Sequence, residues 1–222
     1  MRNARRTTGR VLAVTTLAGV LAVPQAAHAD PVTSTAWASV GSVDVRIDDQ
    51  HIVTPELARC TADGPLGERT AGGATGDIAV FGGGDTACGR QDAIALGRAE
   101  GKRFQADVLK RFGGPALTVR TFSAKCGTTK DGSLGDVQLG TVTGIKVPEN
   151  IPANYRVSVP GQEGEVLATV TLNESVVPSP ADGSLTTHAL HIKLFPKGGP
   201  ASGDIYLGTA RCDPYGKAKA KP

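Results

Sequence analysis

Apolar and polar residues alternate with a period of two along much of the chain, the pattern of strands that bury one face. Within 37–47, Val43 and Val45 share one face and Asp44 and Arg46 take the other. Turn residues separate further segments of this kind in the C-terminal half. These segments are 155–159, 165–177, 184–195 and 204–212.

The segment 185–195 has the longest alternation, and it carries two histidines. An odd spacing places two residues of a strand on opposite faces, so His188 and His191 are expected to face apart. One histidine is then partly packed and the other lies at the surface, and the pair is not predicted to bind a metal. The predicted core-facing set is Thr186, His188, Leu190, Ile192 and Leu194.

One stretch, 91–112, is ambiguous in its secondary structure. Its Ala, Glu, Lys, Arg and Leu content is typical of a helix, but Gly97 and Gly101 interrupt it. A strand and a helix both stay open there.

The fold class follows from the many short strand segments and their turns. The chain holds 29 Gly and 14 Pro, and it has no strong amphipathic helix. These features predict an all-β fold, an antiparallel β-sandwich, with an irregular β-helix as the alternative. We expect residues 30–212 to form a single β-rich domain.

The N-terminus has the three parts of a targeting segment. Its first ten residues carry four arginines and no acid, and an apolar run of 13 residues, 11–23, follows. A helix of that length covers about 20 Å, less than the ~30 Å hydrocarbon layer of a bilayer. Ala27 and Ala29 then place small residues before Asp30. Residues 1–29 are therefore predicted to be a secretory signal peptide, cleaved between Ala29 and Asp30.

Positive charge is in excess at the two ends of the chain. The whole chain carries 24 Lys and Arg and 21 Asp and Glu, a net charge of +3. Because four of the basic residues precede the cleavage site, the remainder is close to neutral, and no nucleic-acid partner is predicted. The Lys-rich end, 213–222, is expected to be a disordered basic tail.

The four cysteines are Cys60, Cys88, Cys126 and Cys212. An even number in an exported chain predicts disulfides, and no C-x-x-C motif indicates a zinc or redox site. Three pairings are open. We favour Cys60–Cys88, which closes a local Gly-rich loop, and Cys126–Cys212, which joins the middle of the chain to its last strand.

No motif for nucleophilic catalysis or phosphate cradling is present. The Gly-rich segment 82–85 lacks the Lys of a phosphate loop and is interpreted as a flexible turn. Asp48, Asp49, Asp77 and Asp85 are oxygen ligands of the kind that calcium prefers, but without the spacing of a calcium loop they are interpreted as solvated turn residues. No catalytic residue, metal ligand or cofactor is predicted.

Three segments of the C-terminal half carry a family resemblance. Residues 170–174 (VTLNE), 183–192 (GSLTTHALHI) and 203–212 (GDIYLGTARC) resemble strands of the choice-of-anchor P family of secreted actinobacterial proteins. The resemblance covers about 117–212 and implies an extracellular domain. It also supports the pairing Cys126–Cys212, because the family usually shows these two cysteines. The family's C-terminal sorting motif and apolar anchor helix do not occur here.

Together these features predict a secreted, non-catalytic β-domain, extracellular or loosely associated with the cell wall. The expected partners are cell-wall polymers or another extracellular protein, and no transmembrane segment is expected after signal cleavage. Lys217, Lys219 and Lys221 are predicted wall contacts through screened electrostatics. The alternatives are a secreted hydrolase with acids dispersed along the sequence, and a soluble inhibitor or small-ligand binder that uses the loop 60–88.

Overall fold

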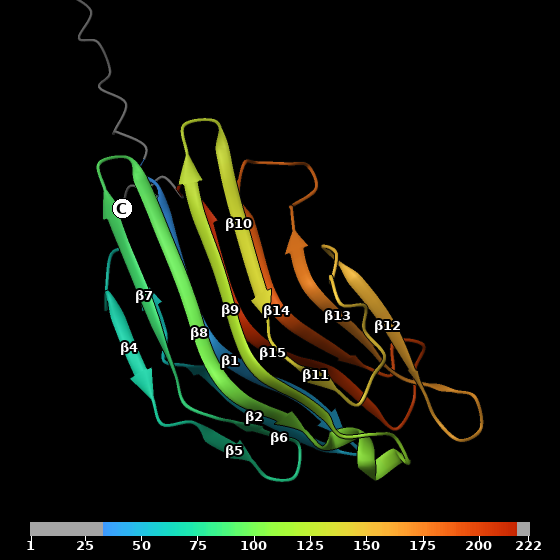
Figure 1. The fold of residues 1–222 in the computed structure, drawn as a ribbon. Coiled ribbons are helices and arrows are strands. Elements are labelled where there is room, and N and C mark those ends of the chain that lie inside the picture. The colour runs from blue at the N-terminus through green and yellow to red at the C-terminus, as the bar shows by residue number, and fades with distance from the viewer. Residues whose placement is uncertain (1–32, 217–222) are drawn as a thin grey trace, which may run out of the picture. The chain divides into compact units, whose positions relative to one another are not determined.

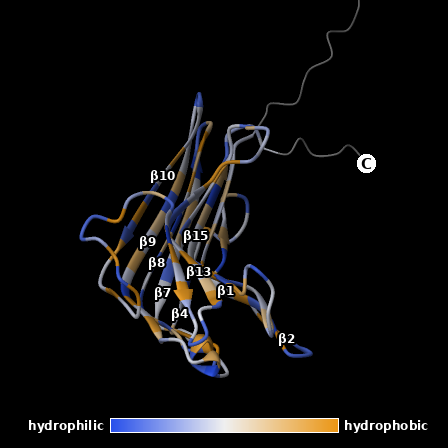
Figure 2. Ribbon diagram, turned by 90° about the vertical axis from the view of Figure 1, so that its right-hand side faces the viewer, coloured by the Kyte–Doolittle hydropathy of each residue, from blue (hydrophilic) through white to orange (hydrophobic). Residues whose placement is uncertain are grey.

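Residues 33–216 of the chain, described by a computed structural model, form two antiparallel sheets that face each other (Figure 1). Figure 2 gives the side view, with β8 and β9 in one layer and β1 and β15 in the other. The predicted β-sandwich is confirmed, and the alternative of a β-helix is wrong. The predicted signal peptide, its predicted cleavage site at Ala29 and Asp30, and the three tail lysines lie outside the described residues.

Sheet A contains the first strands and all of the last ones. Its order is β12-β13-β14-β15-β1-β2, and β3 also pairs with β1. The four C-terminal strands predicted from alternation are all present. The strands of sheet A are β1 (Thr35–Ile47), β2 (Gln50–Leu57), β3 (Cys60–Thr61), β12 (Tyr155–Pro160), β13 (Val166–Val176), β14 (Leu185–Leu194) and β15 (Ala201–Asp213).

Sheet B is built from the middle of the chain. Its main order is β10-β9-β8-β6-β5, while β7 pairs with β8 and β4, and β11 pairs with β9. The strands of sheet B are β4 (Gly67–Thr70), β5 (Gly73–Thr75), β6 (Ala79–Phe81), β7 (Gly84–Gln91), β8 (Ile94–Ala106), β9 (Leu117–Thr129), β10 (Gly132–Leu139) and β11 (Val142–Thr143).

Sheet B contains two segments whose secondary structure was left open or predicted wrongly from the sequence. The ambiguous stretch 91–112 is mostly the strand β8, followed by a short 3-10 helix, η1 (Val108–Phe112). The segment 60–88, expected to be a loop, instead contributes the short strands β4, β5 and β6. Its glycines occupy strand ends and turns and do not form one long exposed loop.

Most of the space between the sheets is filled by large apolar side chains. Phe104 and Leu117 of sheet B and Leu190 and Ile205 of sheet A are almost completely buried there. Each such side chain contributes about 1.5–3 kcal/mol by leaving water. This core sets the ordinary spacing of the sandwich, since packed sheets lie about 10 Å apart.

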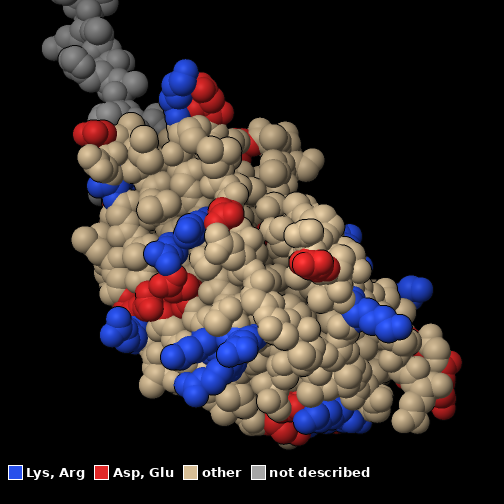
Figure 3. Space-filling model, viewed as in Figure 1, with Lys and Arg blue, Asp and Glu red and all other residues tan. Residues whose placement is uncertain are grey.

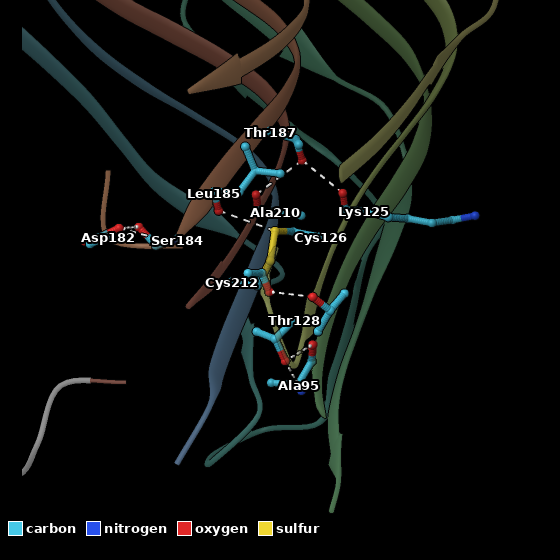
Figure 4. Close-up of a disulfide and its surroundings, with 12 residues drawn as sticks. Ala95, Lys125, Cys126, Thr128, Asp182, Ser184, Leu185, Thr187, Ala210 and Cys212 are labelled. Atoms are coloured by element: carbon cyan, nitrogen blue, oxygen red, sulfur yellow. Dashed lines mark hydrogen bonds between the residues drawn. A yellow bond between two sulfur atoms is a disulfide. The ribbon is translucent and has the colours of Figure 1, made fainter. Parts of the chain in front are cut away.

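A second core, around the cysteines, consists of small side chains alone. Both disulfides cross between the sheets, with Cα–Cα distances of 5.7 Å for Cys60–Cys88 and 5.6 Å for Cys126–Cys212. Figure 4 shows the second of them. These are the two pairs favoured from the sequence. Apart from the cysteines, the buried apolar residues of this core are all alanines. The alanines of this core are Ala36, Ala38, Ala95, Ala99, Ala124 and Ala210.

Gly97 lies where the backbones of the two sheets come close together. A Cβ at this position of β8 would lie only 2.8 Å from the carbonyl oxygen of Trp37 in β1. Any side chain would therefore push the sheets apart. The glycine that seemed to argue against a helix is instead required where β8 passes β1.

The alternation of inward and outward side chains breaks between these two cores. In sheet A, Ala189 and Leu190 of β14 both point into the core, and so do Leu207 and Gly208 of β15. The pairing of β14 with β15 keeps one register on both sides of the break, so the neighbouring strands shift together. Gly208 allows this with a left-handed φ of 59°.

The break makes the predicted core face of 185–195 partly wrong. Leu190, Ile192 and Leu194 are buried as expected. Before the break, however, Thr187 and not His188 belongs to the inward set, and Thr187 is completely buried. Its hydroxyl lies 3.3 Å from the carbonyl oxygens of Lys125 and Ala210 (Figure 4).

Sheet B breaks its alternation in the opposite sense. Two consecutive residues face solvent on each of two paired strands, 102–103 in β8 and 120–121 in β9. The two breaks meet inside the sandwich, because a Cβ on Gly208 would lie 2.6 Å from the ring of Phe122. Phe122 thus follows directly after the outward pair of β9 and packs against the break in sheet A.

The two disulfides are expected to contribute unequally to stability. They enclose sequence separations of 86 and 28 residues. Loop-closure entropy then nominally gives about 4.6 kcal/mol for Cys126–Cys212 and about 3.6 kcal/mol for Cys60–Cys88. In urea unfolding, we expect Cys126→Ala/Cys212→Ala to lose about 1 kcal/mol more than Cys60→Ala/Cys88→Ala. Equal losses would contradict this ordering and assign both effects to the small-residue core that the disulfides share.

Candidate functional site

The break in sheet A brings two histidines to the same outer face. The rings of His188 and His191 lie 6.1 Å apart, and Tyr206 packs against them at 4.6 Å and 4.5 Å between ring centroids. The expectation that the two histidines face apart is wrong. Both residues between them, Ala189 and Leu190, point inward, so a spacing of three returns the chain to the same face.

Two carboxylates hold His191 between them. Its Nδ1 lies 3.0 Å from Oε2 of Glu174 in β13, and its Nε2 lies 2.7 Å from Oδ1 of Asp204 in β15. His188 is opposite Glu174 in the strand pairing, and its Nδ1 lies 2.9 Å from the hydroxyl of Thr209. These five polar residues with Tyr206 form the histidine network, which links three neighbouring strands.

The surroundings shift the pKa values of the two histidines in opposite directions. Burial lowers the pKa of His188 to about 4, so its ring is neutral at pH 7. Burial also acts to lower the pKa of His191, but the hydrogen bonds to Asp204 and Glu174 outweigh it and raise that pKa to about 9. Burial acts to raise the pKa of Glu174, yet its contact with His191 holds that pKa below the ordinary value.

Most polar side-chain atoms of the histidine network contact one another, while Nε2 of His188 lies 4.0 Å from Oε2 of Glu174. Both ring nitrogens of His191 contact carboxylates, and Nδ1 of His188 contacts a hydroxyl. A general base needs a nitrogen or oxygen directed at substrate, and these atoms are directed at one another. Within residues 33–216, no group of three or more His, Cys, Asp and Glu side chains is arranged to hold a metal ion. We interpret the network as a link between β13, β14 and β15.

This arrangement predicts a stability maximum near pH 6.5. His191 has a higher pKa in the folded chain, so its contribution is complete below pH 6.5 and is lost as the pH rises through about 9. His188 has a lower pKa in the folded chain, so stability is lost as the pH falls from 6.5 toward about 4. Each slope amounts to at most about 1.4 kcal/mol per pH unit.

Urea unfolding between about pH 5 and 9 measures both slopes. Relative to wild type, His191→Gln should flatten the alkaline side and His188→Gln the acidic side. The two variants serve as controls for each other, because every other titrating group is unchanged. Parallel profiles for wild type and both variants would contradict the assignment.

The break in sheet B exposes three cations that lie together on its outer face. Lys102 pairs with Thr121 and Phe104 with Val119, so Arg103 and Arg120 occupy the facing positions between them on β8 and β9. Figure 3 shows Lys and Arg side chains gathered on this face, over the lower part of the sheet. We call Lys102, Arg103 and Arg120 the basic cluster.

The cations of the basic cluster have no acidic partner among residues 33–216. Elsewhere on the same sheet, Arg98 binds Glu100, and Lys125 lies 4.0 Å from Asp136. No such ion pair forms at Lys102, Arg103 or Arg120.

The basic cluster lowers the stability of the fold. Like charges in facing positions of neighbouring strands repel each other. Arg103 also has a left-handed backbone with φ 62°, which costs a residue with a side chain about 1–2 kcal/mol. Conformations of this kind concentrate at functional sites, so we take the basic cluster as the candidate site.

Two open hollows flank the basic cluster along β8 and β9. One has a volume of about 420 Å³ and is lined by Arg103 and Arg120 with the polar side chains of Gln105, Thr118 and Thr141. The other, of about 500 Å³, extends from Lys102 toward the edge strands. The cations therefore stand between two places where a ligand can lie against the sheet.

Glycines form the floor of the larger hollow. Gly83, Gly84 and Gly101 line it, and a Cβ on Gly84 would lie 2.5 Å from the carbonyl oxygen of Glu100. The segment 82–85, predicted to be a flexible turn, leads into β7. Asp85 and Glu100 give this hollow an acidic side.

The other carboxylates considered from the sequence serve elsewhere. Asp77 binds Arg111 at 2.7 Å, and this contact lowers the pKa of Asp77. Asp48 and Asp49 follow the end of β1 and are exposed. Sequence reasoning missed the basic cluster, although adjacent cations at 102 and 103 inside a strand pattern were a signal that alternation fails there.

Comparison with protein-family models, with curated proteins and with solved structures gives no match. The fold and the site therefore define the class of protein by themselves. It is a disulfide-linked antiparallel β-sandwich with a basic cluster on one outer face. In the described part of the chain, no helix has the length and apolar character needed to cross a bilayer.

Proposed function

We propose that the protein is a secreted, non-catalytic β-domain that is retained at the cell wall by electrostatic contact with anionic wall polymers. The observation that carries this proposal is the basic cluster, three exposed cations without acidic partners on an open sheet face. The two disulfides support an extracellular location, because such bonds persist in oxidising compartments.

The placement of charge matters more than its total. After loss of the basic leader the chain is close to neutral, so attraction to a polyanion depends on where its cations lie. The basic cluster offers a fixed arrangement, and Lys217, Lys219 and Lys221 of the tail add further positive charge. Interactions between exposed charges weaken within a Debye length, which is about 10 Å at 0.1 M salt.

The histidine network supports a non-catalytic role. It is the one place among residues 33–216 where two histidines and two carboxylates lie within contact distance. Its ring nitrogens and carboxylate oxygens contact one another, and the network joins three strands. A structural link of this kind accounts for the shifted pKa values without a substrate.

Co-sedimentation of residues 30–222 with purified cell walls tests the proposal. We expect sedimentation at low ionic strength and release at about 0.5 M salt, because screening removes exposed charge contacts. Replacing the basic cluster by Gln, as Lys102→Gln/Arg103→Gln/Arg120→Gln, should reduce wall binding by about tenfold, since three phosphate or carboxylate contacts are lost. Deletion of 213–222 should give a smaller reduction.

The matched control removes three cations from sheet A and the loop before β15. Arg46→Gln/Lys193→Gln/Lys197→Gln changes the net charge equally, at exposed residues without ion pairs in the described chain. This variant should sediment like wild type. Sedimentation that is insensitive to salt and to both triple variants would overturn electrostatic retention. Turnover of wall material by the purified protein would overturn the non-catalytic role.

A further inference from the structure

We propose that Arg103 and Arg120 form a phosphate-binding site, and that it takes one phosphodiester group of a linear polymer whose neutral units lie in the two flanking hollows. This inference rests on the proposed wall association and specifies its ligand chemistry. The site is the facing pair of guanidinium groups on β8 and β9, with Lys102 beside them.

The two arginines are held in place by their backbones. The N–H of Arg120 donates to the carbonyl oxygen of Thr141 at 2.9 Å, which fixes β9 beside β11. The N–H of Lys102 donates to the carbonyl oxygen of Gly83 at 3.1 Å. Thus both strands present their cations from a hydrogen-bonded sheet, and the backbone needs little ordering on binding.

The donor set fits phosphate better than carboxylate. Each guanidinium is a planar fork that donates two parallel hydrogen bonds to an oxyanion. A carboxylate has two oxygens and occupies one such fork. A phosphodiester carries its charge on a tetrahedral group that can accept from two forks on neighbouring strands at once, and Lys102 adds a further cation. The hydroxyl of Thr118, 2.6 Å from that of Thr143, lies in the same hollow.

The acidic side of the larger hollow restricts what lies next to the phosphate. Asp85 and Glu100 face each other there across β7 and β8, and Arg69 faces Asp85 from β4. Arg69 and Lys102 line the same hollow and Arg98 binds Glu100, so the carboxylates are balanced by cations. Hydroxyl groups can donate to the carboxylates, so we take the neighbouring unit to be a neutral, hydroxyl-bearing one, a polyol or a sugar.

The smaller hollow has no carboxylate among its lining residues. Asp107, which directly follows β8, binds Lys110 at 2.6 Å and the side-chain amide of Gln105 at 2.6 Å. The contact with Lys110 lowers the pKa of Asp107. Apart from Arg103 and Arg120, the polar side chains that line this hollow are the uncharged hydroxyl and amide groups of Gln105, Thr118 and Thr141.

Calorimetric titration of residues 30–222 with a glycerol-phosphate oligomer of about six units tests the site. An oligogalacturonate of the same length serves as the carboxylate probe and inorganic phosphate as the free anion. We expect the glycerol-phosphate oligomer to bind about tenfold more tightly than either, because only it offers both the phosphodiester and the hydroxyl-bearing neighbour.

Arg120→Lys separates a built site from simple charge. It keeps the charge but removes the fork, and binding of the oligomer should weaken by about tenfold. The charge-removing control Lys197→Gln, on an exposed loop residue, should bind as wild type does. Binding by Arg120→Lys that equals wild type would overturn the phosphate site, while wall retention by unspecific charge would stand.

The variant Arg103→Asn removes a cation of the site without weakening the fold, so a loss of binding cannot be due to unfolding. Asn tolerates the left-handed backbone and removes the facing like charge, so the urea midpoint should rise while oligomer binding weakens. Lys102→Asn, which lacks the left-handed φ, should not raise the midpoint. A rise in midpoint with undiminished binding would overturn the role of Arg103.

The remaining outcomes test the identity of the ligand separately from the proposed retention at the cell wall. Equal affinity for inorganic phosphate and the oligomer would overturn the polymer part of the inference. Equal affinity for a thymidine oligonucleotide of the same length would overturn the polyol or sugar assignment. Tight oligomer binding without wall sedimentation would contradict the proposed function and leave the phosphate site standing.

Discussion

Two disulfides join the sheets of this sandwich at one end, where the other buried apolar residues are alanines. The sheets come close together there, because a Cβ on Gly97 of β8 would lie only 2.8 Å from the carbonyl oxygen of Trp37 in β1. Farther along the same strands, Phe104, Leu117 and Leu190 need the full spacing. The alternation of inward and outward side chains breaks between these two regions. This break decides which residues lie on the outer surfaces of both sheets.

The same change of face has opposite consequences on the two outer surfaces. In sheet A two consecutive residues per strand turn inward, and His188 and His191 meet on the outside beside Glu174. Their polar atoms contact one another, so the result is a link between strands. In sheet B two residues per strand turn outward, and Arg103 and Arg120 are left without acidic partners in the described chain. One surface is closed by its own contacts and the other is open to a ligand.

The sequence was sufficient for the class of fold and the four C-terminal strands, because alternation is a local feature, and it favoured the observed disulfide pairs among three possible pairings. It was insufficient for the faces of 185–195, since the break after Ala189 is shared with the partner strand and packs against Phe122 from the other sheet. The basic cluster was missed for the same reason. Lys102 and Arg103 lie in the stretch left open between strand and helix, and Arg120 lies in another strand.

Nuclear magnetic resonance mapping of bound polymer tests the central claim most directly. With ¹⁵N-labelled residues 30–222 and a glycerol-phosphate oligomer, we expect chemical-shift changes at the backbone amides of 102–103 and 120–121. We also expect them at the side-chain Nε–H groups of Arg103 and Arg120. The signals of His188 and His191 on the opposite sheet should stay in place. Changes confined to sheet A or to the tail, with the outer face of β8 and β9 undisturbed, would contradict the claim that the break in sheet B creates the binding surface.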